Sequence, residues 1–167
     1  DYDQDIFHPV YAKHGMVAAE HVLASRIGLD VLKRGGNAVD AAVAVGFALA
    51  VVLPNAGNLG GGGFMVLHDA ASGENVALDF REMAPARASR DMYLDETGRV
   101  AEGRSLFTHL AVGVPGTVAG MEHALKRWGT KRLADLIAPS IKLAEGGFEV
   151  SPTLAKMLAV EKERLGQ

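Results

Sequence analysis

The segment 38–52 constrains the fold of this chain more than any other part of its sequence. It reads AVDAAVAVGFALAVV, so a helix formed by it is rich in alanine and apolar on nearly every side. Asn37 is a typical N-cap, Asp40 falls in the first turn near the positive end of the helix dipole, and Pro54 ends the helix. A helix without a polar face must be buried on all sides. The folded protein must therefore supply cover all around this helix.

The remaining pattern offers further helices but a single β-hairpin. The segment 83–104 is polar and punctuated by Pro and Gly, which indicates a long irregular loop of a kind that often covers a site. A two-stranded sheet is marginal by itself in water and cannot cover a fully apolar helix. We therefore predict an α+β domain that takes its missing strands from another part of the protein. The other predicted helices and strands span residues 18–34, 64–68, 76–80, 117–128, 133–145 and 152 onward.

Composition excludes several classes of function. The 167 residues carry a formal net charge of -3 with scattered Lys and Arg, so we expect no nucleic-acid partner. The chain has no cysteine, which rules out disulfides, thiolate catalysis and Cys-based zinc sites. The six histidines lack the spacing of a metal site, so we expect no metal and no cofactor. The longest apolar run, 41–53, is too short for a membrane span.

Two motifs are candidates for a site. The run Gly60–Gly63 follows a helix and precedes a strand, which is the reverse of a phosphate-binding loop, so close backbone packing or close approach of a ligand explains it better. Arg81 ends a strand just before the long loop, and its planar guanidinium can bind a carboxylate through two hydrogen bonds. From the residues alone, an ordinary salt bridge of Arg81 with Asp79 or Glu82 is favoured. The sequence has no G-x-S-x-G elbow, and we assign no catalytic residue to this chain.

A collinear series of motifs resembles the γ-glutamyltranspeptidases, most of all the bacterial members. The series extends from Phe7 to Phe148, and the chain is similar to the N-terminal part of the family's large subunit. The motifs are FHPV (7–10), GMVA (15–18), GGNAVDAAVA (35–44), GNLGGGGF (57–64), DFREMAP (79–85), DMYL (91–94) and GVPGTVAG (113–120).

The resemblance implies an N-terminal nucleophile hydrolase fold, an αββα sandwich of which residues 1–167 would form a single incomplete domain. In that family a zymogen cuts itself into a large and a small subunit. The new N-terminal threonine of the small subunit attacks the γ-glutamyl amide of glutathione or another γ-glutamyl donor. The acyl group then passes to water, or to an amino acid or dipeptide. The chain would need the small subunit, or the remaining C-terminal part of its precursor, as its partner, and would be inactive alone.

Arg81 is the one family substrate contact that maps onto this chain. It occupies the Phe-Arg-Glu motif whose arginine pairs with the α-carboxylate of the donor, and this resemblance reverses the salt-bridge interpretation. A cephalosporin (glutaryl) acylase or capsule-anchoring transpeptidase on the same scaffold, and a non-catalytic structural fragment, remain as alternatives. The family implies a periplasmic or extracellular location. The acidic start Asp1–Asp5 indicates that the sequence carries no signal peptide, as in a processed exported protein.

Overall fold

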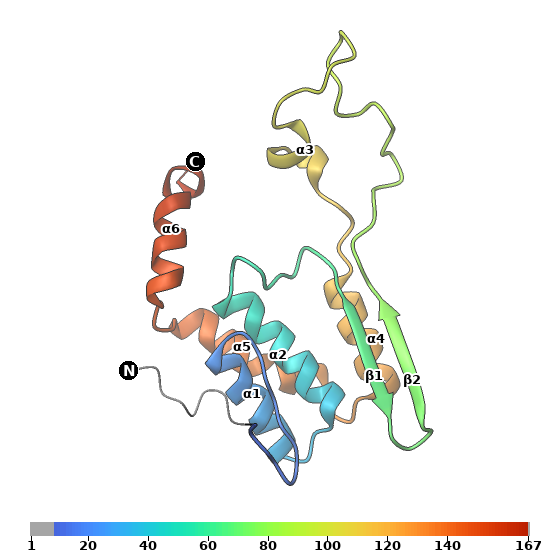
Figure 1. Ribbon diagram of the computed structural model, residues 1–167, viewed down its shortest axis with the longest axis vertical. Coiled ribbons are helices and arrows are strands. Elements are labelled where there is room, and N and C mark those ends of the chain that lie inside the picture. The colour runs from blue at the N-terminus through green and yellow to red at the C-terminus, as the bar shows by residue number, and fades with distance from the viewer. Residues whose placement is uncertain (1–8, 167) are drawn as a thin grey trace.

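The computed structural model describes residues 9–166, in which a group of helices stands beside one β-hairpin (Figure 1). Phe7 and His8 of the first motif, and the acidic start, lie outside the described residues. None of the helices in the described range is long and apolar enough to cross a membrane. The elements are α1 (Val22–Lys33), α2 (Ala38–Val52), β1 (Phe64–Asp69), β2 (Glu74–Asp79), α3 (Arg104–Phe107), the 3-10 turn η2 (His109–Ala111), α4 (Thr117–Trp128), α5 (Leu133–Gly146) and α6 (Pro152–Leu165).

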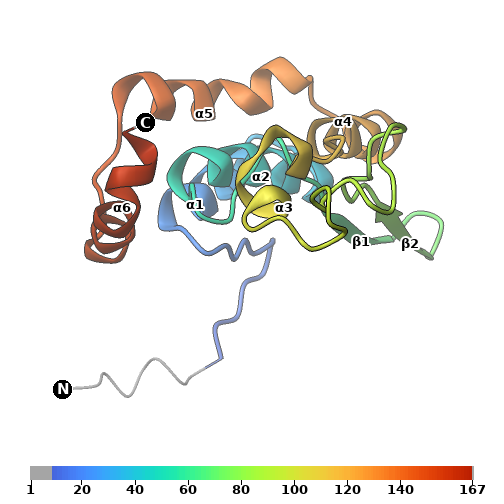
Figure 2. The ribbon, with the colours of Figure 1, turned by 90° about the horizontal axis from the view of Figure 1, so that it is seen from above.

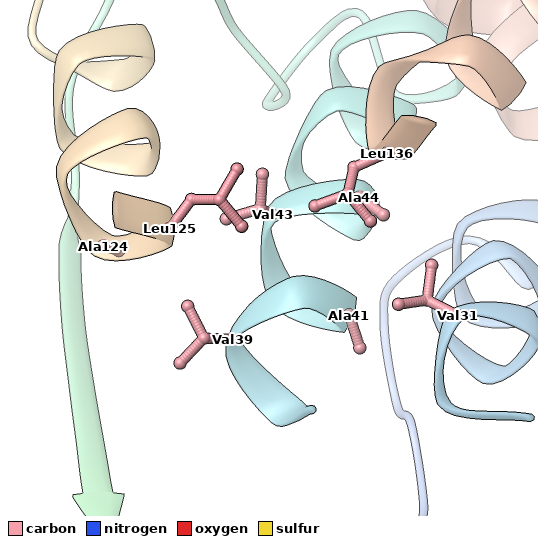
Figure 3. Close-up of a cluster of buried hydrophobic side chains, with 8 residues drawn as sticks. All are labelled: Val31, Val39, Ala41, Val43, Ala44, Ala124, Leu125 and Leu136. Atoms are coloured by element: carbon pink, nitrogen blue, oxygen red, sulfur yellow. The ribbon is translucent and has the colours of Figure 1, made fainter. Parts of the chain in front are cut away.

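Helix α2 is the central helix of the core, and it has the predicted boundaries. A capping box fixes its start, because Asn37 Oδ1 accepts from Asp40 N at 3.0 Å while Asp40 Oδ2 accepts from Asn37 N at 2.8 Å. Helices α1, α5 and α4 all contact α2, and Figure 2 shows these four helices from above. Figure 3 shows the side chains that meet there to form the core. They are Val31, Val39, Ala41, Val43, Ala44, Ala124, Leu125 and Leu136.

The described residues leave part of α2 uncovered. Ala42 is exposed and Val45 is only half-buried. Met16 and Val17, from the segment before α1, line an apolar groove with this side of α2. The predicted burial of α2 on all sides is therefore not reached within residues 9–166, because the hairpin and the other helices cover only its remaining sides.

The hairpin has one packed face and one open face. Met65 pairs with Leu78 across the two antiparallel strands, and both side chains pack against the core. On the opposite face, Phe64 is 63% exposed and Val66 is 81% exposed. Strands that face water usually alternate apolar and polar residues. An apolar outer face is therefore typical of a sheet that another element covers.

Some element boundaries differ from those predicted. Helix α1 begins at Val22 rather than Ala18, because His21 is extended and caps the helix with Nδ1, which accepts from Leu23 N at 3.2 Å. Strand β2 begins at Glu74, two residues before the predicted 76, because Gly73 (φ 75°) allows a tighter turn. The short helices α3 and η2 were not predicted. They end the irregular excursion, which Figure 1 shows reaching away from the helices and the hairpin.

Asp40 also joins the start of α2 to the turn between α4 and α5. Its fully buried carboxylate accepts hydrogen bonds from Thr130 N (2.8 Å), Thr130 Oγ1 (2.6 Å) and Lys131 N (3.0 Å), besides the one from Asn37 N. Burial acts to raise the pKa of Asp40, but the hydrogen bonds, led by that of the Thr130 hydroxyl, outweigh it and hold the pKa below its ordinary value. The folded protein therefore stabilises the ionised form of the Asp40 side chain.

Candidate substrate-binding site

Arg81 follows β2 directly, at the point where the chain leaves the hairpin. Its backbone N donates to Asp79 Oδ1 at 3.0 Å, and the residue is exposed. Within residues 9–166 the ion pairs involve other residues and Arg81 has none. The salt bridge with Asp79 or Glu82 that the residue pattern favours is therefore not formed there, and the guanidinium is available to an external carboxylate.

Phe80 fixes the backbone immediately before Arg81. Its N donates to Gly63 O at 3.1 Å, and its ring lies so close to Gly63 that a Cβ built there would stand 3.0 Å from Phe80 Cε2. A Cβ built at Gly120, in α4, would overlap the same ring, and one at Gly116 would overlap the Phe80 carbonyl oxygen. Glycine is the residue that permits such close approaches. The corner of the chain at Phe80 is consequently held against α4 and the glycine run.

One member of the glycine run, Gly62, packs against the backbone of Arg81. A Cβ built at Gly62 would lie 2.6 Å from Arg81 Cα, so no larger residue fits there without a shift. The neighbouring Gly61 O accepts from Gly116 N at 2.7 Å and from Thr117 N at 3.1 Å. Of the two explanations for the run, close backbone packing therefore applies at Gly62, whereas a Cβ built at Gly60 would stand in open space.

The segments 58–63, 80–82 and 113–120 thus meet around Arg81. Just beyond it, Met83 N donates to Val114 O at 3.3 Å and Val114 N donates to Met83 O at 2.8 Å. These two bonds close the base of the excursion that follows Arg81. Sequence motifs far apart in the chain therefore combine to fix one backbone position.

Arg81 lies on open surface rather than in an enclosed cavity. Several surface hollows of the described residues lie elsewhere, for example beside Arg34 and Lys131 or between Pro54 and α6. Nor is any group of three or more His, Asp or Glu side chains in the described range placed to hold a metal ion. Arg81 is thus an exposed arginine whose backbone is fixed by its neighbours.

Comparison with known proteins identifies close relatives. The family described as gamma-glutamyltranspeptidase matches residues 24–167. The chain is 56% identical to the glutathione hydrolase proenzyme of Escherichia coli (strain K12), over 92% of this chain and 26% of that protein. The crystal structure of Helicobacter pylori gamma-glutamyltranspeptidase matches with a TM-score of 0.89 and 57% identity, over 93% of this chain and 45% of that one. Cephalosporin acylase from Bacillus halodurans matches with a TM-score of 0.80 and 32% identity, over 99% of this chain and 31% of that one.

These matches confirm the predicted resemblance and the predicted fold class. The structural neighbours are N-terminal nucleophile hydrolases of the transpeptidase and acylase type, and the chain, with its mixed helices and strands, covers a part of them. It spans about a quarter of the length of the curated relatives, which are named glutathione hydrolase proenzymes and are therefore enzymes. The chain belongs to the γ-glutamyltranspeptidase family.

Proposed function

We propose that this chain, as the N-terminal part of a large subunit, supplies the arginine that binds the α-carboxylate of a γ-glutamyl donor such as glutathione. The observation that carries the proposal is the state of Arg81, which is exposed, follows β2 and has no ion pair within the described residues. A guanidinium matches a carboxylate in charge and in planar geometry. The names of the relatives, glutathione hydrolase proenzymes, support the choice of donor.

In the complete enzyme, Arg81 binds and orients the donor while the chemistry takes place on other polypeptide. The N-terminal threonine of the small subunit attacks the γ-glutamyl carbonyl, and its own α-amino group takes the hydroxyl proton. The amine leaves with that proton, and the γ-glutamyl acyl group then passes from the threonine ester to water in hydrolysis or to an amino acid or dipeptide in transpeptidation. A two-point hydrogen bond at the far end of the donor holds the carbonyl in line for this attack.

The partner is the remaining C-terminal part of the same precursor. The precursor cuts itself into a large and a small subunit. Residues 1–167 form a single domain that is incomplete without this partner. The apolar outer face of the hairpin, with Phe64 and Val66, and the uncovered side of α2 at Ala42 support a partner that packs on both. The assembled enzyme acts in the periplasm or outside the cell, as the family does.

The complete precursor is expected to release p-nitroaniline from γ-glutamyl-p-nitroanilide and to cleave glutathione. The discriminating donor is glutaryl-p-nitroanilide, which keeps the carboxylate that Arg81 binds but lacks the α-amino group. We expect at least a roughly tenfold preference in kcat/KM for the γ-glutamyl donor, because a site built for the amino group is left with unpaired polar groups by the glutaryl donor. A preference for the glutaryl donor would replace the proposal with the acylase function, to which the cephalosporin acylase neighbour points.

Residues 1–167 alone are expected to release no p-nitroaniline above the buffer rate, because the proposed nucleophile lies in the small subunit. The complete enzyme at the same molar concentration is the positive control. Gel filtration and circular dichroism of the isolated piece establish whether it is folded during the assay. Turnover by residues 1–167 without a partner would contradict the proposal that the nucleophile lies in the small subunit.

A further inference from the structure

The hydroxyl of Thr117 connects the start of α4 to the glycine run. Thr117 is 3% exposed, and its Oγ1 donates to Asn58 Oδ1, which also accepts from Gly61 N at 3.0 Å. The backbone N of Thr117 donates to Gly61 O at 3.1 Å. The side chain and the backbone of a single residue therefore hold both ends of the turn 58–61.

The turn held in this way lies against the backbone of Arg81. Gly62, the next residue, approaches Arg81 Cα with no side chain between the two backbones. On the other side, the ring of Phe80 is confined between Gly63 and Gly120. Close-packed backbones transmit small shifts because they leave no space to absorb them. A shift of the turn would therefore move the Cα from which the guanidinium extends.

We propose that Thr117 and Asn58 are positioning residues whose hydrogen bond sets the reach of the Arg81 guanidinium toward the donor carboxylate. This inference rests on the proposed function of Arg81. Thr117 and Asn58 act through the turn and through Gly62, and they do not touch the donor. A bidentate ion pair tolerates only small displacements of the guanidinium. Loss of the hydrogen bond that holds the turn 58–61 therefore weakens binding of the carboxylate. A merely structural role for the bond would change the amount of active enzyme and leave donor recognition as it is.

The test uses the complete enzyme and two variants of one position. Thr117→Val removes the hydroxyl and keeps the shape, whereas Thr117→Ser keeps the hydroxyl. We expect Thr117→Val to raise the KM for γ-glutamyl-p-nitroanilide about fivefold to tenfold with kcat changed less than about twofold, and Thr117→Ser to stay near the parent. With 4-aminobutyryl-p-nitroanilide, which lacks the carboxylate, kcat/KM of Thr117→Val is expected to equal that of the parent.

Asn58→Ala probes the same bond from its exposed side, and it supplies the result if Thr117→Val does not mature. The same loss, confined to carboxylate donors, is expected. Equal losses on both donors, or no loss in either variant, would overturn the positioning role. An Arg81→Ala enzyme that keeps its affinity for carboxylate donors would instead overturn the proposed function, so the two failures are told apart.

Discussion

Replacing Arg81 by alanine in the complete heterodimer is expected to raise the KM for γ-glutamyl-p-nitroanilide about 30-fold to several-thousand-fold. Removing one partner of a charge pair that is enclosed in the complex costs roughly 2–5 kcal/mol, and about 1.4 kcal/mol corresponds to a factor of ten. The carboxylate does not react, so the contact is present in both the ground state and the transition state. The loss should therefore appear in KM more than in kcat, as steady-state kinetics can show.

Matched controls separate this effect from a general loss of charge or of fold. Arg81→Lys keeps the charge but loses the planar fork, so an intermediate KM is expected. Arg90→Ala removes an arginine whose side chain is 96% exposed, and it should leave the KM unchanged. With 4-aminobutyryl-p-nitroanilide as donor, Arg81→Ala should match the parent. An unchanged KM of Arg81→Ala for the γ-glutamyl donor would remove Arg81 from the donor site.

Replacing Asp40 by alanine is expected to lower the free energy of unfolding by about 3–5 kcal/mol, because the backbone N–H groups of Asn37, Thr130 and Lys131 lose their buried acceptor together. The measurement is the shift in the urea midpoint of the complete heterodimer. Asp135→Ala is the matched control, because its exposed carboxylate forms a surface ion pair with Arg132 and such a pair contributes little. Similar midpoints for the two variants would contradict a structural role for Asp40.

The same carboxylate predicts a loss of stability in acid. The pKa of Asp40 is lowered in the folded protein, so the stabilisation is complete above the unfolded pKa of about 3.9 and is lost as the pH falls through the folded pKa. Asp40→Asn does not titrate at this position. The difference in unfolding midpoint between the parent and Asp40→Asn should therefore shrink below about pH 4, and a constant difference down to pH 2 would count against this account.

The elements that the sequence predicted well are those with strong local signals at both ends. The apolar helix has the capping pair Asn37 and Asp40 before it and Pro54 after it, and α2 begins and ends as predicted. The start of α1 was predicted too early because the apolar spacing continues back to Ala18, and a histidine cap gives a weak signal in sequence. The helices α3 and η2 are too short to show any periodicity.

The candidate site was harder to predict, because its geometry depends on contacts between distant segments. Arg81 was singled out by resemblance, whereas its residue neighbours favoured a salt bridge that the described structure does not contain. Close packing was one of two explanations for the glycine run and holds at Gly62 and Gly63, yet nothing local indicates that their partners are Arg81 and Phe80. The bond between Thr117 and Asn58 joins residues 59 positions apart, and the bonds from Thr130 to Asp40 span 90. Such pairings follow from tertiary packing and leave no periodic pattern.

The backbone hydrogen bonds between Met83 and Val114 close the base of the irregular excursion, so the position of Arg81 does not depend on the residues within it. Because the ends of this excursion are fastened to each other, the entropy of closing it rises only slowly with its length. Evolution, or an engineer, can therefore lengthen, shorten or exchange the intervening stretch at small thermodynamic cost. The segment between Met83 and Val114 can in this way vary in length and sequence while the backbone of Arg81 keeps its place.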